Sequence, residues 1–108
     1  MPTPFQQRVY DALVLIPKGR ITTYGSIAKY LGSKAVRAVG TAVGKNPNAP
    51  TVPCHRVVPS TGEIGNYSAA EGVTTKIALL KEEGVVVKNG KVVDFTSLMF
   101  TFKGLNNA

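Results

Sequence analysis

The sequence predicts a mainly helical domain with a small β-hairpin, a combination typical of the winged helix-turn-helix fold. Apolar residues recur at helical spacing in several segments, and two of these are short and joined by a tight turn at Gly32-Ser33. Near the carboxyl end, valine-rich runs flank Asn89-Gly90, the dipeptide preferred in type I′ hairpin turns. A chain of 108 residues can bury one hydrophobic core, so we expect a single domain over residues 1–108.

The first helix is expected over residues 4–16. Thr3-Pro4-Phe5-Gln6 has the form of a capping box with proline at the first helical position. The apolar residues that follow at helical spacing, before Pro17 ends the pattern, are Phe5, Val9, Ala12, Leu13 and Ile16.

Two short helices are expected next. Thr22-Thr23 can cap a helix over about residues 24–31, and Ser33 can cap another over about residues 34–44. The second is small and apolar along one side and basic elsewhere, as in the recognition helix of a helix-turn-helix. An ordinary corner between two helices has the same pattern, so DNA binding is one of two interpretations at this point.

The middle of the chain should lack regular structure. Residues 46–53 contain three prolines, which predicts an extended, stiff loop that delivers the following residues into the domain. Residues 59–68 are rich in turn formers and should lie at the surface.

A fourth helix and the hairpin complete the expected fold. The helix should cover about residues 72–83 and stop at Gly84. Residues 85–93 should form the hairpin around Asn89-Gly90, and residues 103–108 should be frayed. The apolar face of the fourth helix would consist of Val73, Ile77 and Leu80.

Composition narrows the class of function. The chain has 13 basic and 6 acidic residues, a net charge of +7, which favours a polyanion such as nucleic acid as partner, although a merely soluble basic protein fits equally well. No apolar run approaches the roughly 20 residues that cross a bilayer, and the amino end lacks the layout of a signal peptide. We therefore expect no membrane partner and a cytoplasmic location, or a nuclear one in a eukaryote.

Cys54 and His55 are the only cysteine and the only histidine, and they are neighbours. A thiol with an imidazole nearby to accept its proton is a common nucleophile, whereas the alternative is a lone cysteine that is an inert part of the core. One cysteine cannot form an internal disulfide, and one cysteine with one histidine falls short of the four ligands of a structural zinc site. We expect no metal.

The segment from Pro53 to Val58, Pro-Cys-His-Arg-Val-Val, is similar to the active-site motif of the O6-alkylguanine-DNA alkyltransferases, the methylated-DNA–protein-cysteine methyltransferases. Over residues 5–95, further blocks resemble the family in the same order. They are Thr23-Tyr24-Gly25 with Ile27-Ala28, Arg37-Ala38-Val39-Gly40, Asn46-Pro47, Gly65-Asn66-Tyr67-Ser68, and Leu79-Leu80 with Glu83-Gly84.

The resemblance implies a DNA-repair protein that transfers a methyl or other small alkyl group from O6-alkylguanine, in duplex DNA, to Cys54. His55 would take the thiol proton through a water and Glu83 would orient the imidazole; Asn46 also belongs to the catalytic set. Each molecule would act once and need no cofactor, because the acceptor is the protein itself. A monomer would suffice.

The resemblance also implies a way of reaching the base, which must be turned out of the duplex. Arg37 would fill the vacated space and Tyr24 would crowd the phosphate. Ala35 and Ala38 would let their helix approach the minor groove closely. The guanine pocket would be shaped by Asn46, Pro53, Tyr67 and Ser68. Taken singly, each of these residues has a simpler explanation. Asn46 could do no more than end a helix, Tyr24 could belong to the hydrophobic core, and Glu83 and Arg37 could be ordinary solvent-exposed side chains.

Three features depart from the family pattern. An amino-terminal domain usually precedes this one, and residues 68–76 lack the usual Gly-Gly and are about two residues longer, which could reshape the pocket. The compact length resembles the alkyltransferase-like proteins, which bind alkylated DNA but replace the cysteine. Cys54 favours transfer over such a non-catalytic lesion sensor, and a winged-helix transcription regulator is a third hypothesis.

Overall fold

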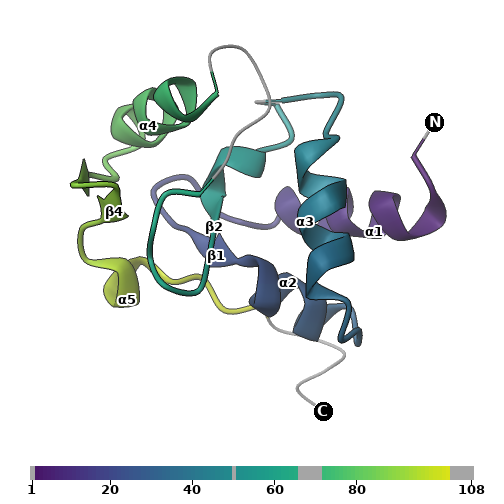
Figure 1. Ribbon diagram of the computed structural model, residues 1–108. Helices are drawn as coiled ribbons and strands as arrows, with labels where there is room; N and C mark the ends of the chain where they lie inside the picture. Colours follow the sequence, from purple (N-terminus) through teal and green to yellow (C-terminus); the bar gives the residue numbers. More distant parts are fainter. Residues whose placement is uncertain (1, 50, 66–71, 103–108) are drawn as a thin grey trace.

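The computed structural model describes residues 2–49, 51–65 and 72–102. Its helices and strands form two groups with a small parallel sheet between them (Figure 1). The first group consists of α1 (Pro4–Leu13), α2 (Tyr24–Tyr30) and α3 (Val36–Gly44). The second group consists of α4 (Val73–Glu82), the antiparallel strands β3 (Val87–Lys88) and β4 (Lys91–Val92), and α5 (Phe95–Leu98). The sheet between them pairs β1 (Thr22–Thr23) with β2 (Val57–Val58).

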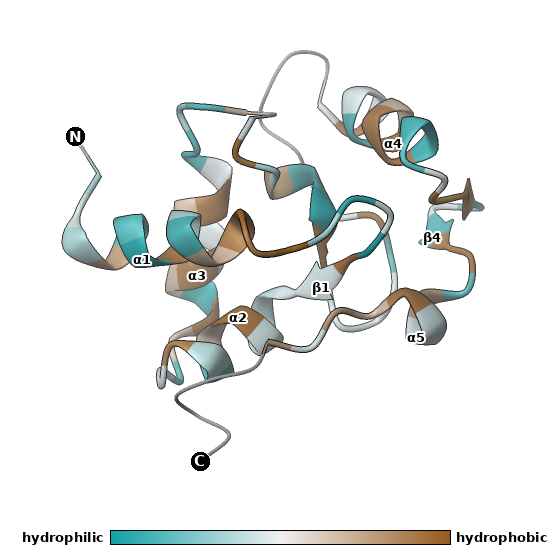
Figure 2. Ribbon diagram, turned by 180° about the vertical axis from the view of Figure 1, so that it is seen from behind, coloured by the Kyte–Doolittle hydropathy of each residue, from teal (hydrophilic) through white to brown (hydrophobic). Residues whose placement is uncertain are grey.

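Each group has its own hydrophobic cluster. The first cluster lies among α1, α2 and α3, and α1 and α3 each carry hydrophobic and hydrophilic residues along their lengths (Figure 2). The second cluster joins α4 to the hairpin and to the residue before β1, and consists of Ile21, Val58, Ile64, Leu80, Val85 and Val92. The mainly helical fold with a small hairpin and a helix-turn-helix is therefore confirmed, with the hairpin on the side of the molecule away from α3 (Figure 1).

β2 is shared by both clusters. Successive residues of a strand point to opposite faces, and here Val57 belongs to the first cluster and Val58 to the second. Both are completely buried. The parallel pairing of Thr22 with Val57 and of Thr23 with Val58 holds this strand beside the start of α2. The residues just before β2 consequently lie where the two groups meet.

The first helix is shorter than residues 4–16. The capping box is present: the Thr3 hydroxyl accepts from the Gln6 amide, and the Gln6 side chain accepts from the Thr3 amide. The helix ends at Leu13, after which the amides of Leu15 and Ile16 donate to the carbonyls three residues earlier. This tighter turn keeps Ile16 buried, which explains why the apolar periodicity continues past the end of the helix.

The start of α3 also differs from the prediction. Ser33 does not cap it; its hydroxyl accepts from the Ala35 amide in a local turn, and the helix begins at Val36. The cap of α2 is as expected, because the Thr23 hydroxyl accepts from the Ser26 amide at 3.1 Å.

The end of α4 and the hairpin agree with the sequence. Gly84 has φ of +87°, and the Val85 amide donates to the Leu80 carbonyl, the closing bond of a glycine-terminated helix. Asn89 and Gly90 both have positive φ, 53° and 76°, as a type I′ turn requires.

The extended loop expected over residues 46–53 is wrong for the part that the structure describes. The Val52 amide donates to the Asn48 carbonyl at 2.9 Å, so the chain forms a compact turn. Asn46 initiates it, because its side-chain oxygen accepts from the Asn48 amide at 3.1 Å. The proline-fixed φ is compatible with a turn as well as with an extended chain.

Within the described ranges, none of the helices has the length and apolar character that crossing a bilayer requires. Residues 103–108, expected to be frayed, lie outside those ranges.

Candidate active site

Cys54 begins a short 3-10 helix, η1 (Cys54–Arg56), that leads directly into β2. Its amide donates to the Val52 carbonyl at 2.8 Å, and the Arg56 amide donates to the Pro53 carbonyl at 3.1 Å. The thiol-bearing residue is 4% exposed and belongs to the first hydrophobic cluster, with Pro53 buried beside it in sequence. Cys54 is therefore held in a fixed backbone at the junction of the two groups.

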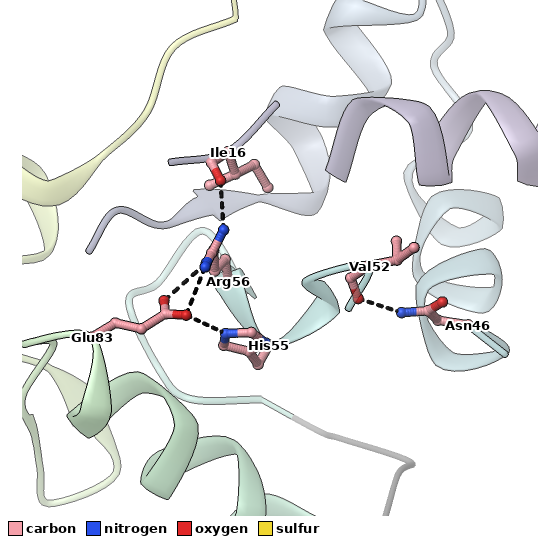
Figure 3. A network of polar contacts seen from close by, with 6 residues as sticks. All are labelled: Ile16, Asn46, Val52, His55, Arg56 and Glu83. Carbon is pink, nitrogen blue, oxygen red and sulfur yellow. Dashed lines mark hydrogen bonds and ion pairs between the residues drawn. The ribbon is translucent and has the colours of Figure 1, made fainter. Parts of the chain in front are cut away.

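His55 faces the end of α4. Its Nε2 lies 3.0 Å from Oε2 of Glu83, which follows the last residue of that helix (Figure 3). The His55 side chain is only 3% exposed. The structure thus brings together His55 and Glu83 from positions 28 residues apart, as the family resemblance implied.

Arg56 completes this network. Burial opposes ionisation of Glu83, but hydrogen bonds from Arg56 and His55 and their charges outweigh it and lower the pKa of the carboxyl to about 2. Burial lowers the pKa of His55, and the positive charges of Arg56 and Lys76 act in the same direction against the opposing effect of Glu83. At neutral pH the pair is therefore a carboxylate and a neutral imidazole.

These charge states fix where the histidine proton lies. An ionised carboxylate only accepts hydrogen bonds, so Nε2 of His55 carries the proton and Nδ1 has a free lone pair. Nδ1 is buried and has no hydrogen-bond partner among the described residues. A buried, unprotonated ring nitrogen next to a cysteine is a group able to accept a thiol proton.

Lys76 is a buried cation near Cys54 that was not among the site residues predicted from the sequence. Its Nζ donates to the Val57 carbonyl at 2.7 Å, and its residue is 0% exposed. Burial lowers the pKa of Lys76 to about 8, while negative charge at Cys54 acts to raise it. The available signal was its position four residues before Leu80, on the buried face of the expected helix.

Asn46 does more than end a helix. Besides its bond to the Asn48 amide, its side-chain nitrogen donates to the Val52 carbonyl at 2.7 Å (Figure 3). Asn46 follows α3, and Val52 accepts from the Cys54 amide. One side chain thus ties the end of α3 to the segment that positions Cys54.

The residues assigned to DNA contact lie on and beside α3. Ala35, Arg37 and Ala38 are exposed. Tyr24 is half-buried against the first cluster, 4.0 Å from the place a Cβ would take at Gly40. Burial raises the pKa of Tyr24, and negative charge at Cys54 acts in the same direction.

Two of the residues assigned to the substrate pocket, Tyr67 and Ser68, lie outside the described residues. A cavity of about 430 Å³ adjoins the His55–Glu83 pair and is lined by Lys18, His55, Arg56, Leu79, Glu82 and Glu83.

Replacing Glu83 with alanine is expected to lower the free energy of unfolding by about 3 kcal/mol at pH 7, because it leaves a buried arginine and histidine without their carboxylate. The pKa of Glu83 is depressed from 4.5 to about 2. Its contribution is therefore complete above pH 4.5 and is lost as the pH falls toward 2, so the difference between wild type and variant should shrink over that range.

Urea unfolding at several pH values measures this effect. The matched control is Glu82→Ala, which removes the exposed neighbouring carboxylate and should change the free energy little. Equal losses in the two variants would contradict the structural role given to Glu83.

Together, the fold and the site define a helix-turn-helix domain with a cysteine beside a buried histidine–glutamate–arginine network. Residues 4–85 match the family described as 6-O-methylguanine DNA methyltransferase, DNA binding domain. The chain belongs to this family.

Individual relatives and solved structures allow a more detailed comparison. It is 51% identical over 83 residues to the methylated-DNA–protein-cysteine methyltransferase of Methanosarcina acetivorans, a match that covers 76% of this chain and 52% of that protein. The structure is similar to that of Mycobacterium tuberculosis OGT in complex with DNA, with a TM-score of 0.72, 48% identity, and coverage of 77% of this chain and 51% of that one. The chain thus spans about half the length of these two proteins.

A third similar structure is S. pombe Atl1 in complex with damaged DNA containing O6-carboxymethylguanine. Its TM-score is 0.80 at 34% identity, and the match covers 94% of this chain and 99% of that one. The similarity in architecture therefore extends over nearly the whole of both chains.

Proposed function

We propose that this protein repairs DNA by transferring an alkyl group, methyl in the simplest case, from O6-alkylguanine to Cys54, once per molecule. The observation that carries the proposal is the arrangement at His55, which follows Cys54 in the chain: its Nε2 is bound to Glu83 and its buried Nδ1 has no hydrogen-bond partner among the described residues. Membership of the methyltransferase family supports it.

The chemistry balances without a cofactor. His55 Nδ1 takes the Cys54 proton through an intervening water, and the sulfur attacks the alkyl carbon. The new S–C bond forms as the bond between carbon and guanine O6 breaks, and its electron pair stays on the base. The guanine anion then takes up a proton, which the protonated His55 can return through water, so the products are a thioether at Cys54, neutral His55 and ordinary guanine. Regenerating the thiol would require a nucleophile to displace the cysteine thiolate from the alkyl carbon, and a thiolate is a poor leaving group there, so the site is used only once.

Duplex DNA is the partner that this chemistry requires. In the proposal α3 enters the minor groove, where the small exposed side chains of Ala35 and Ala38 allow close approach. Arg37, exposed on the same helix, fills the place of the turned-out base, and Tyr24 presses on the neighbouring phosphate. The net charge of +7 favours this association.

The turned-out guanine would be received next to Cys54. Pro53 and Asn46 would shape one wall, since Asn46 holds the carbonyl of Val52 immediately before Pro53. Tyr67 and Ser68 would supply further contacts to the base. We propose that the protein acts as a monomer in the cytoplasm, or in the nucleus of a eukaryote.

A second candidate function is non-catalytic binding that marks alkylated bases for another repair pathway. The close match to Atl1, over 99% of that chain, favours it. Cys54 with its histidine–glutamate pair opposes it, because lesion binding alone needs no nucleophile or base.

Mass spectrometry after incubation with DNA tests the proposal. The protein is mixed with a duplex containing one O6-methylguanine, with the same duplex undamaged, and with free O6-methylguanine. We expect the lesion duplex to add one methylene to the peptide containing Cys54, the undamaged duplex to add nothing, and the free base to react much more slowly. Lesion-selective binding without a mass gain would replace transfer by the second function. Equal binding to both duplexes without a gain would favour a transcription regulator.

A further inference from the structure

Arg56 holds Glu83 in a way that no other described residue does. Its Nε donates to Oε1 of Glu83 at 2.9 Å and its Nη2 donates to Oε2 at 2.7 Å (Figure 3). Nη1 donates to the carbonyl of Ile16 at 2.7 Å. One guanidinium therefore joins the chain after α1, the active-site segment and the end of α4.

We propose that Arg56 is a positioning residue for alkyl transfer, fixing Glu83 so that His55 keeps its proton on Nε2 and leaves Nδ1 unprotonated. The assignment deepens the proposed function and rests on it. Arg56 itself touches neither Cys54 nor the alkyl group in this scheme; it acts through Glu83.

The geometry of the shared oxygen supports this role. Oε2 of Glu83 receives hydrogen bonds from both Arg56 Nη2 and His55 Nε2, at 2.7 and 3.0 Å. Glu83 lies just beyond the last residue of α4, where the helix itself does not restrict its side chain. Without the two parallel bonds from Arg56, the carboxylate could rotate and present either oxygen, or neither, to the imidazole.

Lysine could not replace this arginine. A guanidinium matches a carboxylate with two parallel N–H groups in one plane, whereas an ammonium is a point charge without that geometry. The third nitrogen of Arg56 donates to the carbonyl of Ile16, and this bond fixes the plane of the guanidinium. The side chains of Arg56 and Glu83 are only 15% and 10% exposed, so water does not readily substitute for the lost bonds.

The charge of Arg56 has a separate effect that can be distinguished from its shape. The charged groups that face His55 are Lys76 from α4, Glu83 just after that helix, and Arg56 from the segment of His55 itself, while Lys18 and Glu82 line the adjoining cavity. Removing the charge of Arg56 raises the pKa of His55, since that charge acts to lower it. A lysine at this position keeps the positive charge but loses the two parallel hydrogen bonds to Glu83, whereas a methionine loses both.

The single histidine makes a direct measurement possible. In ¹⁵N NMR of the whole protein, His55 should show the Nε2–H form in the wild type. Arg56→Lys should give a mixture of the two neutral forms with nearly the wild-type pKa. Arg56→Met should add an increase in the pKa of His55. A pure Nε2–H form in both variants would overturn the proposal.

Single-turnover kinetics with the O6-methylguanine duplex gives a second readout. Because each molecule reacts once, the final methyl uptake measures the fraction of competent molecules, and the rate constant measures how fast the active site transfers the methyl group. We expect Arg56→Lys to slow the rate constant about 10-fold with unchanged final uptake, as loss of an orienting partner typically does. In the Arg56→Met variant, the loss of rate at acidic pH should occur at a higher pH than in the wild type, because the pKa of His55 is raised.

Arg20→Lys is the matched control, since the Arg20 guanidinium also donates to a backbone carbonyl, but to that of Ser97, which is not part of the His55–Glu83–Arg56 network. It should behave as wild type. A fall in final uptake with an unchanged rate constant in Arg56→Lys would overturn positioning in favour of a purely structural role. Failure of the wild type to take up methyl would overturn the proposed function, while the NMR result would still decide the role of Arg56.

Discussion

Replacing Cys54 with serine is expected to abolish methyl uptake while leaving binding to the lesion duplex close to that of the wild type. Serine occupies nearly the same volume, but its hydroxyl is a far weaker nucleophile than a thiol at neutral pH. The residues proposed to contact DNA lie on and beside α3 and are unchanged. Intact-protein mass measures uptake, and fluorescence anisotropy with a labelled duplex measures binding.

Cys54→Ala provides the matched control. Cys54 lies in a hydrophobic cluster, where an unpaired serine hydroxyl costs about 1–3 kcal/mol, whereas alanine introduces no polar group. If both variants bind the lesion and neither gains mass, the loss belongs to the sulfur and not to misfolding. Methyl uptake by either variant would place the acceptor elsewhere in the chain.

Replacing His55 with glutamine should slow methyl transfer by roughly 100- to 10,000-fold, the usual contribution of a general base. A glutamine amide can still donate to Glu83, so the ion pair between Glu83 and Arg56 is retained. It cannot take a proton at neutral pH. The rate constant of a single turnover, followed by quenched mass spectrometry, measures the loss.

The pH dependence sharpens this prediction. Burial lowers the pKa of His55 below its usual 6.5, so the wild-type rate should hold through neutral pH and fall only as the pH drops through that lowered value. Below it the imidazole is protonated and cannot accept the thiol proton. His55→Gln should lack this acidic limb. A glutamine variant with the wild-type rate and the same limb would show that another group is the base.

Local signals in the sequence predicted the helices and the hairpin well. The capping box at Thr3, the cap at Thr23 and the Asn89-Gly90 turn each act within a few residues, so their chemistry can be recognised without knowing the fold. The turn after Asn46 was missed because proline indicates a break in regular structure, not the form of the connection. Its form depends on two hydrogen bonds of the Asn46 side chain.

Contacts between residues far apart in the chain could not be predicted from local patterns in the sequence. The contact of His55 with Glu83 was expected from the family resemblance, but nothing in the sequence indicates that Arg56 bridges Glu83 and Ile16. These partners are 27 and 40 residues away in the chain. Likewise, β1 and β2 have two residues each, too short for an alternating pattern to predict a strand.

The shared strand β2 gives the protein two separable parts. Cys54 belongs to the cluster of α1, α2 and α3, whereas Glu83 follows α4, whose Leu80 lies in the other cluster. Proteins open locally in cooperative units, and separate hydrophobic clusters are the places where we expect such units. A molecule in which α4 has come away would keep its helix-turn-helix and its thiol but lose the partner that orients the base. We expect such a molecule to occupy a lesion without repairing it, because alkyl transfer needs side chains from both clusters whereas DNA contact needs only the first.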